Sequence, residues 1–276
     1  MPDHCQKLRR PLGAKMNDSY CILAGLQEPI AAAAIHDGHA LRPDVEPRIA
    51  LDAAERLREE DPYTAGWTAL VSTRLIGVRS RFEMDLNRPR EQAVYQRAED
   101  EWGLDVWKST LPASVVCESL VQYDAFYADA ERTLRALQAR WGRFIVLDLH
   151  TYSHRRNGPD AEPDDPALNP EINIGTGTMD RDRWAPVVNH VVQALAAPDA
   201  EGRERDVREN VKFRGGQFSR WVHETFPESG CSIAMEFRKS FMNEWTGVAS
   251  TDQVRAIRAQ LASMLSGMPR TLRQVP

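Results

Sequence analysis

The chain of 276 residues has few cysteines, no long apolar run and no excess of positive charge. Its four cysteines are scattered without a Cys-x-x-Cys pair, which argues against a disulfide framework or a cysteine zinc knuckle. No apolar run approaches the roughly 20 residues of a membrane-spanning helix, and no signal-peptide segment is recognisable. The formal net charge of -5, without a dominant basic stripe, argues against a general nucleic-acid binder. We therefore expect a cytoplasmic protein that binds neither nucleic acid nor membrane.

The composition is that of an ordinary globular protein, with 42% hydrophobic and 27% charged residues. A chain of this length can form one large domain that buries most of its apolar surface. The polar residues 1–20 are expected to be poorly ordered. Residues 21–276 are expected to form a single α/β domain.

Short apolar runs alternate with amphipathic segments along the chain. The runs predict strands at 29–35, 70–76, 81–86, 144–149, 172–174, 211–213 and 231–237. Apolar positions three or four residues apart predict helices at 51–60, 123–141, 184–197, 218–226 and 251–267. This alternation predicts an α/β fold with a largely parallel sheet. Open sheets of this kind place ligands beyond the carboxyl ends of their strands.

Histidines follow two of the predicted strands. His36 and His39 come directly after the first strand, and His150 comes directly after a later, continuously apolar strand. Rigid strand ends can hold three imidazoles around one metal ion and leave a fourth position open for water, which hydrolysis requires. Asp37 and Asp148 lie beside them and could orient the rings. The alternative is that these histidines only cap strands or bind backbone.

The segment 79–89 combines arginine, acidic and amide side chains. Arg81, Asp85 and Asn87 alternate along the predicted strand, so they can share one face. A guanidinium binds a carboxylate through two parallel hydrogen bonds, and an adjacent amide can add another. Asn87 and Arg88 are therefore a candidate clamp for a substrate carboxylate, and a surface salt bridge is the alternative.

Glu236 is an acid inside an otherwise apolar predicted strand. A buried carboxylate needs a partner or a raised pKa, and either suits a general base that acts on metal-bound water. The alternative is an ion pair in the core with Arg238 or Arg214.

Two loops that contain glycines follow short predicted strands. The loop at 173–178 lacks the Gly-Lys-Ser or Gly-Lys-Thr ending of a phosphate loop, which argues against nucleotide binding. The loop at 212–216 could present its backbone and Arg214 to an anion. Thr176 in the first loop and Arg214 in the second are the candidates for substrate binding. Simple turns are the alternative for both loops.

In their order along the chain, these segments resemble those of the N-formylglutamate amidohydrolase family, and the resemblance spans about residues 34 to 244. It rests on His-Asp-Gly-His at 36–39, Ser-Arg-Phe-Glu-Met-Asp-Leu-Asn-Arg-Pro at 80–89, Leu-Asp-Leu-His-Thr-Tyr-Ser at 147–153, Asn-Ile-Gly-Thr at 173–176, Asn-Val-Lys-Phe-Arg-Gly-Gly at 210–216 and Met-Glu-Phe-Arg at 235–238. The order is also similar to that of the wider zinc carboxypeptidase and aspartoacylase group. The resemblance implies a mixed, mostly parallel sheet of about eight strands flanked by helices, and one zinc ion per chain.

The resemblance implies that His36 and His150 bind this zinc ion. The carboxypeptidase group has His-x-x-Glu in the first motif, where this chain has His-x-x-His. His39 is therefore the third predicted ligand, and Asp61 is the reserve candidate. A histidine in place of a glutamate raises the net charge of the site by one, which favours zinc-bound hydroxide.

The resemblance also assigns roles in catalysis. Glu236 becomes the general base, Arg81 polarises the scissile carbonyl, and Asn87 with Arg88 holds the substrate carboxylate. The implied reaction is hydrolysis of N-formyl-L-glutamate, a small carboxylate-bearing substrate, to formate and L-glutamate, a step in histidine degradation. The alternatives are hydrolysis of another N-acyl amino acid or a short peptide, and a non-catalytic metal or carboxylate binder on the same scaffold.

Overall fold

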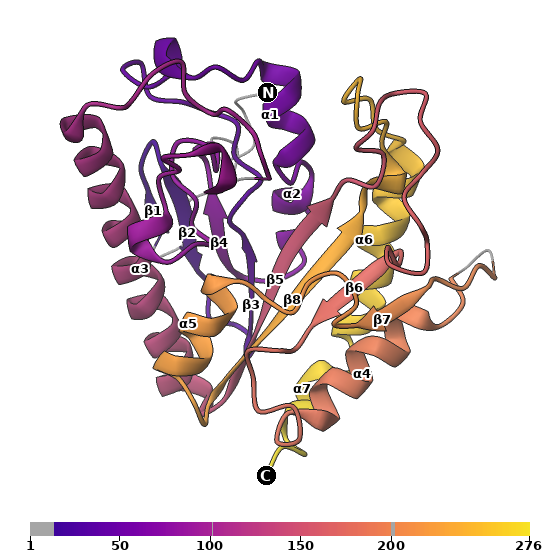
Figure 1. The fold of residues 1–276 in the computed structure, drawn as a ribbon. Coiled ribbons are helices and arrows are strands. Elements are labelled where there is room, and N and C mark those ends of the chain that lie inside the picture. The colour runs from indigo at the N-terminus through magenta and orange to yellow at the C-terminus, as the bar shows by residue number, and fades with distance from the viewer. Residues whose placement is uncertain (1–13, 101, 200–201) are drawn as a thin grey trace.

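The computed structural model describes residues 14–100, 102–199 and 202–276 (Figure 1). They form one eight-stranded sheet with β1 (Ala14–Met16), β2 (Tyr20–Ala24), β3 (Ile30–Ala34), β4 (Thr73–Gly77), β5 (Phe144–Tyr152), β6 (Ile172–Gly175), β7 (Val207–Glu209) and β8 (Gly230–Arg238). The strand order is β1-β2-β4-β3-β5-β8-β6-β7. The pairs β3/β4, β3/β5, β5/β8 and β6/β7 are parallel, and β1/β2, β2/β4 and β6/β8 are antiparallel.

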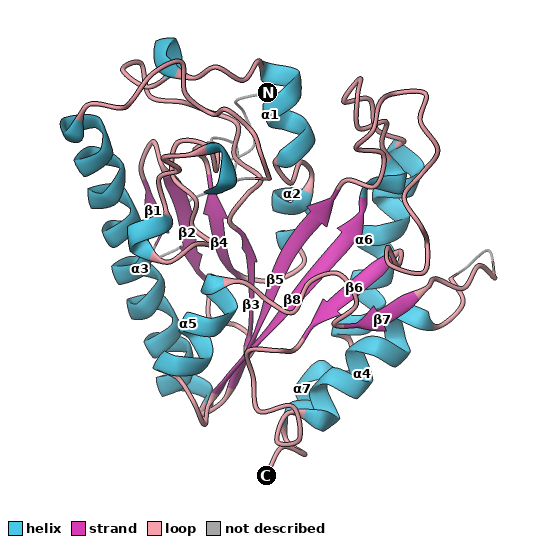
Figure 2. Ribbon diagram, in the orientation of Figure 1, coloured by secondary structure: helices cyan, strands magenta, loops and turns pink. Residues whose placement is uncertain are grey.

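Helices cover both faces of this sheet (Figure 2). They are α1 (Ala53–Glu59), α2 (Thr64–Thr68), α3 (Ala113–Trp141), α4 (Ala185–Ala196), α5 (Gln217–Thr225), α6 (Thr251–Leu265) and α7 (Met268–Leu272), with short 3-10 helices at Glu46–Arg48, Arg90–Gln92, Ala98–Asp100 and Lys239–Phe241. Helices α3 and α5 pack on one face, and α2, α4, α6 and α7 pack on the other. Among the described residues, no helix is both long and apolar enough to cross a membrane.

Alternating side chains of the central strands fill two hydrophobic cores. In β5, Ile145 and Leu147 belong to the core under α4 and α6, while Phe144 and Val146 belong to the core under α3 and α5. Successive residues of a strand face opposite sides of the sheet, so a strand that is apolar throughout is buried on both faces. The strand predicted from this apolar run is therefore confirmed as a central strand covered by helices.

The predicted class, an α/β fold with a mixed, mostly parallel sheet of eight strands flanked by helices, is confirmed. The strand predicted at 81–86 is wrong, because this segment forms turns with local hydrogen bonds. The backbone N–H groups of Glu83 and Met84 donate to the carbonyl of Ser80, and that of Asn87 donates to Oδ1 of Asp85. Local bonds of this kind compete with pairing to a neighbouring strand.

The strand predicted at 211–213 is also wrong. The backbone N–H groups of Val211 and Lys212 donate to Oδ1 of Asn173 instead of to a neighbouring strand. The strand in this region is β7, which lies just before the predicted segment. A side-chain amide therefore satisfies the backbone donors that a strand ladder would otherwise use.

Several boundaries differ from those predicted, three of them in ways that matter for the fold or the site. Strand β1 and the first residue of β2 lie within the segment 1–20, so regular structure begins before residue 21, while residues 1–13 lie outside the described residues. Helix α3 begins at Ala113 instead of at residue 123. Strand β5 continues to Tyr152, so His150 lies inside the end of the strand and not after it.

The topology brings the carboxyl ends of β3, β5 and β8 to one edge of the sheet, because these three strands are parallel neighbours. His36 follows β3, and His150 in β5 pairs in register with Glu236 in β8. Three residues that are far apart in the sequence therefore lie at the same edge.

Candidate active site

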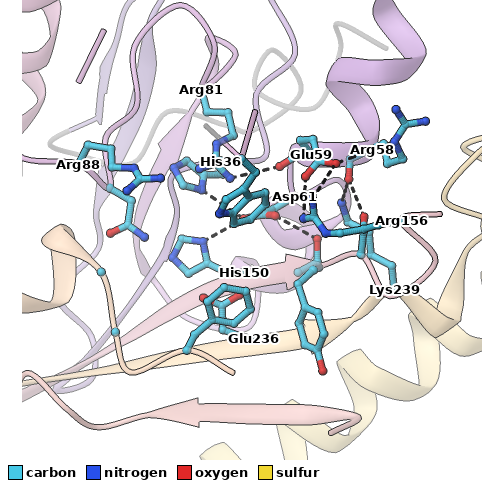
Figure 3. Close-up of a pocket in the computed structure, with 18 of the residues that line it drawn as sticks. His36, Arg58, Glu59, Asp61, Arg81, Arg88, His150, Arg156, Glu236 and Lys239 are labelled. Carbon is cyan, nitrogen blue, oxygen red and sulfur yellow. Dashed lines mark hydrogen bonds and ion pairs between the residues drawn. The ribbon is translucent and has the colours of Figure 1, made fainter. Parts of the chain in front are cut away.

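His36, Asp61 and His150 form a buried cluster at this edge of the sheet (Figure 3). Oδ2 of Asp61 lies 3.4 Å from Nδ1 of His36 and 2.9 Å from Nδ1 of His150. The backbone N–H of Asp61 donates to the carbonyl of His36 at 2.9 Å, which holds the turn after α1 against the end of β3. One potential ligand atom from each residue therefore lies within 4.8 Å of the other two.

A second carboxylate holds the far nitrogen of each ring. Nε2 of His36 lies 2.7 Å from Oδ1 of Asp85, and Nε2 of His150 lies 2.9 Å from Oδ1 of Asp148. Metal-binding histidines commonly donate their second N–H to a carboxylate, which fixes the orientation and the tautomer of the ring. Both Nδ1 atoms are therefore directed toward Asp61 by partners on the opposite side of each ring.

The donor set could hold a divalent cation such as zinc. Burial lowers the pKa of both histidines, but the charges of nearby aspartates outweigh it, so the pKa of His36 is raised and that of His150 is raised well above its usual value. Burial raises the pKa of Asp61, yet hydrogen bonds from both histidines hold that pKa below its ordinary value. A divalent cation between the rings would supply the positive charge that these carboxylates otherwise draw from protonated histidines. Atoms bound tetrahedrally at zinc distances of about 2.0–2.1 Å lie roughly 3.3 Å apart, and the two separations from Oδ2 of Asp61, 3.4 and 2.9 Å, lie on either side of this value.

Glu236 lines the same pocket as the cluster, a cavity of about 260 Å³. Burial raises the pKa of Glu236 to about 7, although the charge of His150 acts to lower it. A carboxylate with a pKa near the working pH can both take and return a proton. Arg238, considered as an ion-pair partner, instead donates from Nη1 to the carbonyl of Asn169 at 2.9 Å.

His39 lies outside the cluster. Its Nδ1 lies 2.5 Å from Oε2 of the buried Glu60, and its side chain is 42% exposed. Asp61, the reserve candidate, is the third member of the cluster, beside His36 and His150. Oδ1 of Asp37 accepts the backbone N–H of Ala65 at the start of α2, while Asp85 and Asp148 are the carboxylates that lie against the rings of His36 and His150.

Asn87, Arg88 and Arg81 also line the pocket. Oδ1 of Asn87 accepts the backbone N–H of Phe218 at 3.0 Å, which leaves Nδ2 as the atom that can donate to a ligand. Nη2 of Arg81 donates to Oδ2 of Asp85 at 2.8 Å, and Nε of Arg88 lies 4.0 Å from the same oxygen. The predicted clamp and the predicted polarising arginine are thus brought together around one buried carboxylate.

Arg214 and Thr176 are placed differently. Arg214 lines the pocket, and its carbonyl accepts the backbone N–H of Gly177 at 2.7 Å. Across residues 14–100, 102–199 and 202–276, the Arg214 side chain makes no hydrogen bond or ion pair, so its charge is open to a ligand. Thr176 does not line the pocket; its Oγ1 donates to Oε2 of Glu209 and accepts from Nδ2 of Asn210. Thr176 therefore supports the loop behind the pocket.

Part of the pocket wall was not predicted from the sequence. It contains Arg58, Glu59, Trp102 and Lys239. Lys239 is buried and donates from Nζ to two backbone carbonyls near the end of α1, at 2.5 and 2.6 Å. These residues come from the end of α1 and from two separate later segments. Sequence reasoning missed them because no local motif unites them.

The fold and the pocket define a class of protein: an α/β scaffold that carries a His–Asp–His cluster and a buried acid in one polar pocket is a candidate hydrolase. The family model described as N-formylglutamate amidohydrolase matches residues 29–242. That match covers more than half of the chain, so the chain belongs to the N-formylglutamate amidohydrolase family. Membership of this family supports an amidohydrolase activity.

Several solved structures are similar to this chain. N-formylglutamate amidohydrolase from Ralstonia eutropha JMP134 matches with a TM-score of 0.71 and 15% identity, over 94% of this chain and 99% of that chain. A gene product of Agrobacterium tumefaciens matches with a TM-score of 0.65 and 17% identity, over 94% and 96% of the two chains. A metallo-carboxypeptidase from Burkholderia cenocepacia matches with a TM-score of 0.41 and 14% identity, over 96% and 66%. The comparison with curated proteins found no match.

Proposed function

We propose that this protein is a zinc-dependent amidohydrolase that cleaves N-formyl-L-glutamate to formate and L-glutamate. Family membership supports the reaction type, and the cationic pocket supports a small substrate that carries carboxylates. The observation that carries the proposal is the convergence of His36, Asp61 and His150 beside Glu236 in one pocket. A non-catalytic binder has no use for the buried acid. The role in histidine degradation and the cytoplasmic location stay predictions.

His36, Asp61 and His150 would hold the zinc ion, with Asp61 in place of the predicted His39. Three protein ligands leave one position open, which distinguishes catalytic zinc sites from structural ones. When bound, zinc lowers the pKa of a water molecule to about 7 and polarises a carbonyl group. The carboxylates behind the rings would accept each Nε2–H and so keep Nδ1 unprotonated toward the ion.

Glu236 would act first as general base and then as general acid. It takes a proton from the water that attacks the amide carbon, and it returns that proton to the amine nitrogen as the C–N bond breaks. A pKa of about 7 suits both steps near neutral pH. Arg81 would donate to the carbonyl oxygen as negative charge develops there.

The two carboxylates of N-formyl-L-glutamate would bind at two places in the pocket. Asn87 and Arg88 would hold the α-carboxylate through N–H donors. Arg214, whose side chain makes no ion pair within the described parts of the chain, would take the side-chain carboxylate. Binding both carboxylates holds the amide of the substrate beside the cluster. The amide is then already oriented for attack, which lowers the entropic part of the barrier.

The substitution Glu236→Gln tests the proposal. Glutamine has nearly the same shape but cannot accept the proton, so we expect loss of formate release with about one zinc ion still bound per chain. Glu224→Gln, on the exposed face of α5, is the matched control and should keep the wild-type rate. A near-normal rate for Glu236→Gln would contradict the assigned role.

A substrate panel separates the proposed substrate from the alternatives. The panel contains N-formyl and N-acetyl derivatives of glutamate, aspartate and leucine, and the amine released is measured with and without chelator. We expect the highest kcat/KM for N-formyl-L-glutamate and loss of activity with chelator. Preference for another N-acyl amino acid would replace the substrate and keep the reaction class.

A further inference from the structure

The pocket has two sides around the His–Asp–His cluster. Figure 3 shows Arg81 and Arg88 on one side, and Arg58, Arg156 and Lys239 on the other. In an N-acyl amino acid, the acyl substituent extends from the scissile carbonyl away from the amine and its carboxylate. If the clamp holds the α-carboxylate, as the proposed function requires, the acyl group extends toward the second side.

The cations of this second side already have partners. Nη2 of Arg156 lies 2.8 Å from Oε2 of Glu59, and Nη1 lies 3.4 Å from Oε1. Nζ of Lys239 is used by two backbone carbonyls. The guanidinium carbon of Arg58 lies 4.0 Å from the centre of the Trp245 ring, and its Nε lies 3.9 Å from Glu59. This side therefore offers little unpaired positive charge to an anionic acyl group.

Arg156 also joins a third segment at the pocket wall. Its guanidinium carbon lies 4.1 Å from the centre of the Trp102 ring, a distance at which cation and ring attract each other. Trp102 is 51% exposed although it lines the pocket, and its φ of 46° is uncommon for a bulky residue. Unusual backbone conformations of this kind persist where the surroundings enforce them, often at functional sites.

The loop that carries Arg156 is fixed from behind. Glu244 accepts the backbone N–H groups of His154 and Arg155 at 2.7 and 3.1 Å, and it also bonds Nδ1 of His154 at 2.6 Å. The indole N–H of Trp245 donates to the carbonyl of Arg155 at 2.9 Å. A wall held by so many bonds does not withdraw freely to admit a longer acyl chain.

We infer that Arg156 and Trp102 determine acyl-group specificity: they close the acyl side of the pocket with a rigid, charge-compensated wall. The wall admits a formyl or similarly small uncharged group and rejects longer or anionic ones. This inference rests on the proposed function, because the position of the carboxylate clamp decides which side receives the acyl group.

The test compares three acyl groups on one amino acid, so that the clamp always meets the same carboxylates. The substrates are N-formyl-, N-butanoyl- and N-succinyl-L-glutamate, of which the last two have four acyl carbons and differ by one carboxylate. We expect Arg156→Ala and Trp102→Ala each to raise the butanoyl-to-formyl ratio of kcat/KM by about tenfold or more, because methylene-sized space in a pocket changes selectivity on this scale. Arg155→Ala is the matched control and should keep the wild-type ratio, because Arg155 lies outside the pocket lining.

The outcomes separate the inference from the proposed function. If wild-type protein cleaves N-formyl-L-glutamate and both variants keep its selectivity, the inference is overturned and the proposed function stands. Wild-type preference for the succinyl over the butanoyl substrate, lost in Arg156→Ala, would also overturn it, because Arg156 would then bind an anion directly. If wild-type protein cleaves none of the three, both proposals fail. Arg156→Ala and Trp102→Ala lie in different segments of the chain. If one variant does not fold, the selectivity of the other still tests the inference.

Discussion

Nε2 of His36 lies 2.7 Å from Oδ1 of Asp85, and Oδ2 of the same carboxylate accepts a hydrogen bond from Arg81. One buried carboxylate therefore orients both a proposed metal ligand and a proposed catalytic residue. We expect Asp85→Asn to weaken zinc binding about ten- to a hundredfold, because partners behind metal ligands commonly contribute this much. Competition with a chromogenic chelator measures the affinity.

A surface carboxylate provides the control for that measurement. Asp124 forms an exposed ion pair with Arg90 at 2.7 Å, and Asp124→Asn should bind zinc like the wild type. Wild-type zinc affinity in Asp85→Asn would show that His36 does not depend on this carboxylate for its orientation.

The third metal ligand can be decided by a pair of alanine variants. Asp61 lies between the two ring nitrogens, while His39 is bonded to Glu60 outside the cluster. We therefore expect Asp61→Ala to lose most of its zinc and His39→Ala to keep about one zinc ion per chain. Elemental analysis of both purified proteins measures this, and the opposite pattern would restore His39 as the ligand.

Gly216 sets the position of the carboxylate clamp. A Cβ atom at this residue would come within 2.3–2.5 Å of the side-chain atoms of Asn87, so the amide must move. We expect Gly216→Ala to lower kcat/KM by about ten- to a hundredfold, since small displacements of positioning groups have effects of this size. Gly66→Ala is the control, because a Cβ atom there meets nothing within 4 Å. Equal kinetics for the two variants would show that Asn87 does not position the substrate.

The sequence predicted the parts of the site that lie on strands. His36 and His150 follow apolar runs and Glu236 lies near the end of one, and parallel strands gather such positions at one edge of the sheet. The third member of the cluster could not be predicted in the same way. Whether His39 or Asp61 joins the cluster depends on the turn after α1, which brings Asp61 back to the end of β3 although it lies 25 residues after His36 in the sequence. No local sequence pattern encodes this return.

The sequence pattern predicted a strand wrongly where local and side-chain hydrogen bonds take the place of pairing between strands. The alternation at 81–86 matches a half-buried strand, yet Phe82, Met84 and Leu86 are all buried within a set of turns. The hydrogen bonds of Asp85 hold these turns, and their partners include His36, which is distant in sequence. Trp102 and Lys239 in the pocket lining were missed for a related reason, because they come from a loop and a short helix far from the other lining residues in the sequence.

His223 should make stability depend on pH. Burial lowers the pKa of His223 to about 4, and its Nε2 accepts the backbone N–H of Ser232 at 3.0 Å, which requires an unprotonated nitrogen. Below an unfolded-state pKa of about 6.5 the unfolded chain binds a proton that the folded protein excludes until about pH 4, so stability falls as the pH falls through this window. From pH 7 to pH 5 this costs about 2 kcal/mol.

Urea unfolding of wild type and His223→Gln at both pH values isolates this contribution, because all other titrating groups are shared. The wild type should lose about 2 kcal/mol more stability than the variant between pH 7 and pH 5. Equal losses in the two proteins would show that His223 is not held neutral in the fold.

Zinc titration of chelator-treated protein tests the proposed metal centre most directly. Formate release from N-formyl-L-glutamate should return in proportion to added zinc and reach its maximum at about one ion per chain, and Asp61→Ala should show no such recovery. Full activity in protein shown to be free of metal, or full recovery in Asp61→Ala, would contradict the zinc-dependent mechanism built on His36, Asp61 and His150.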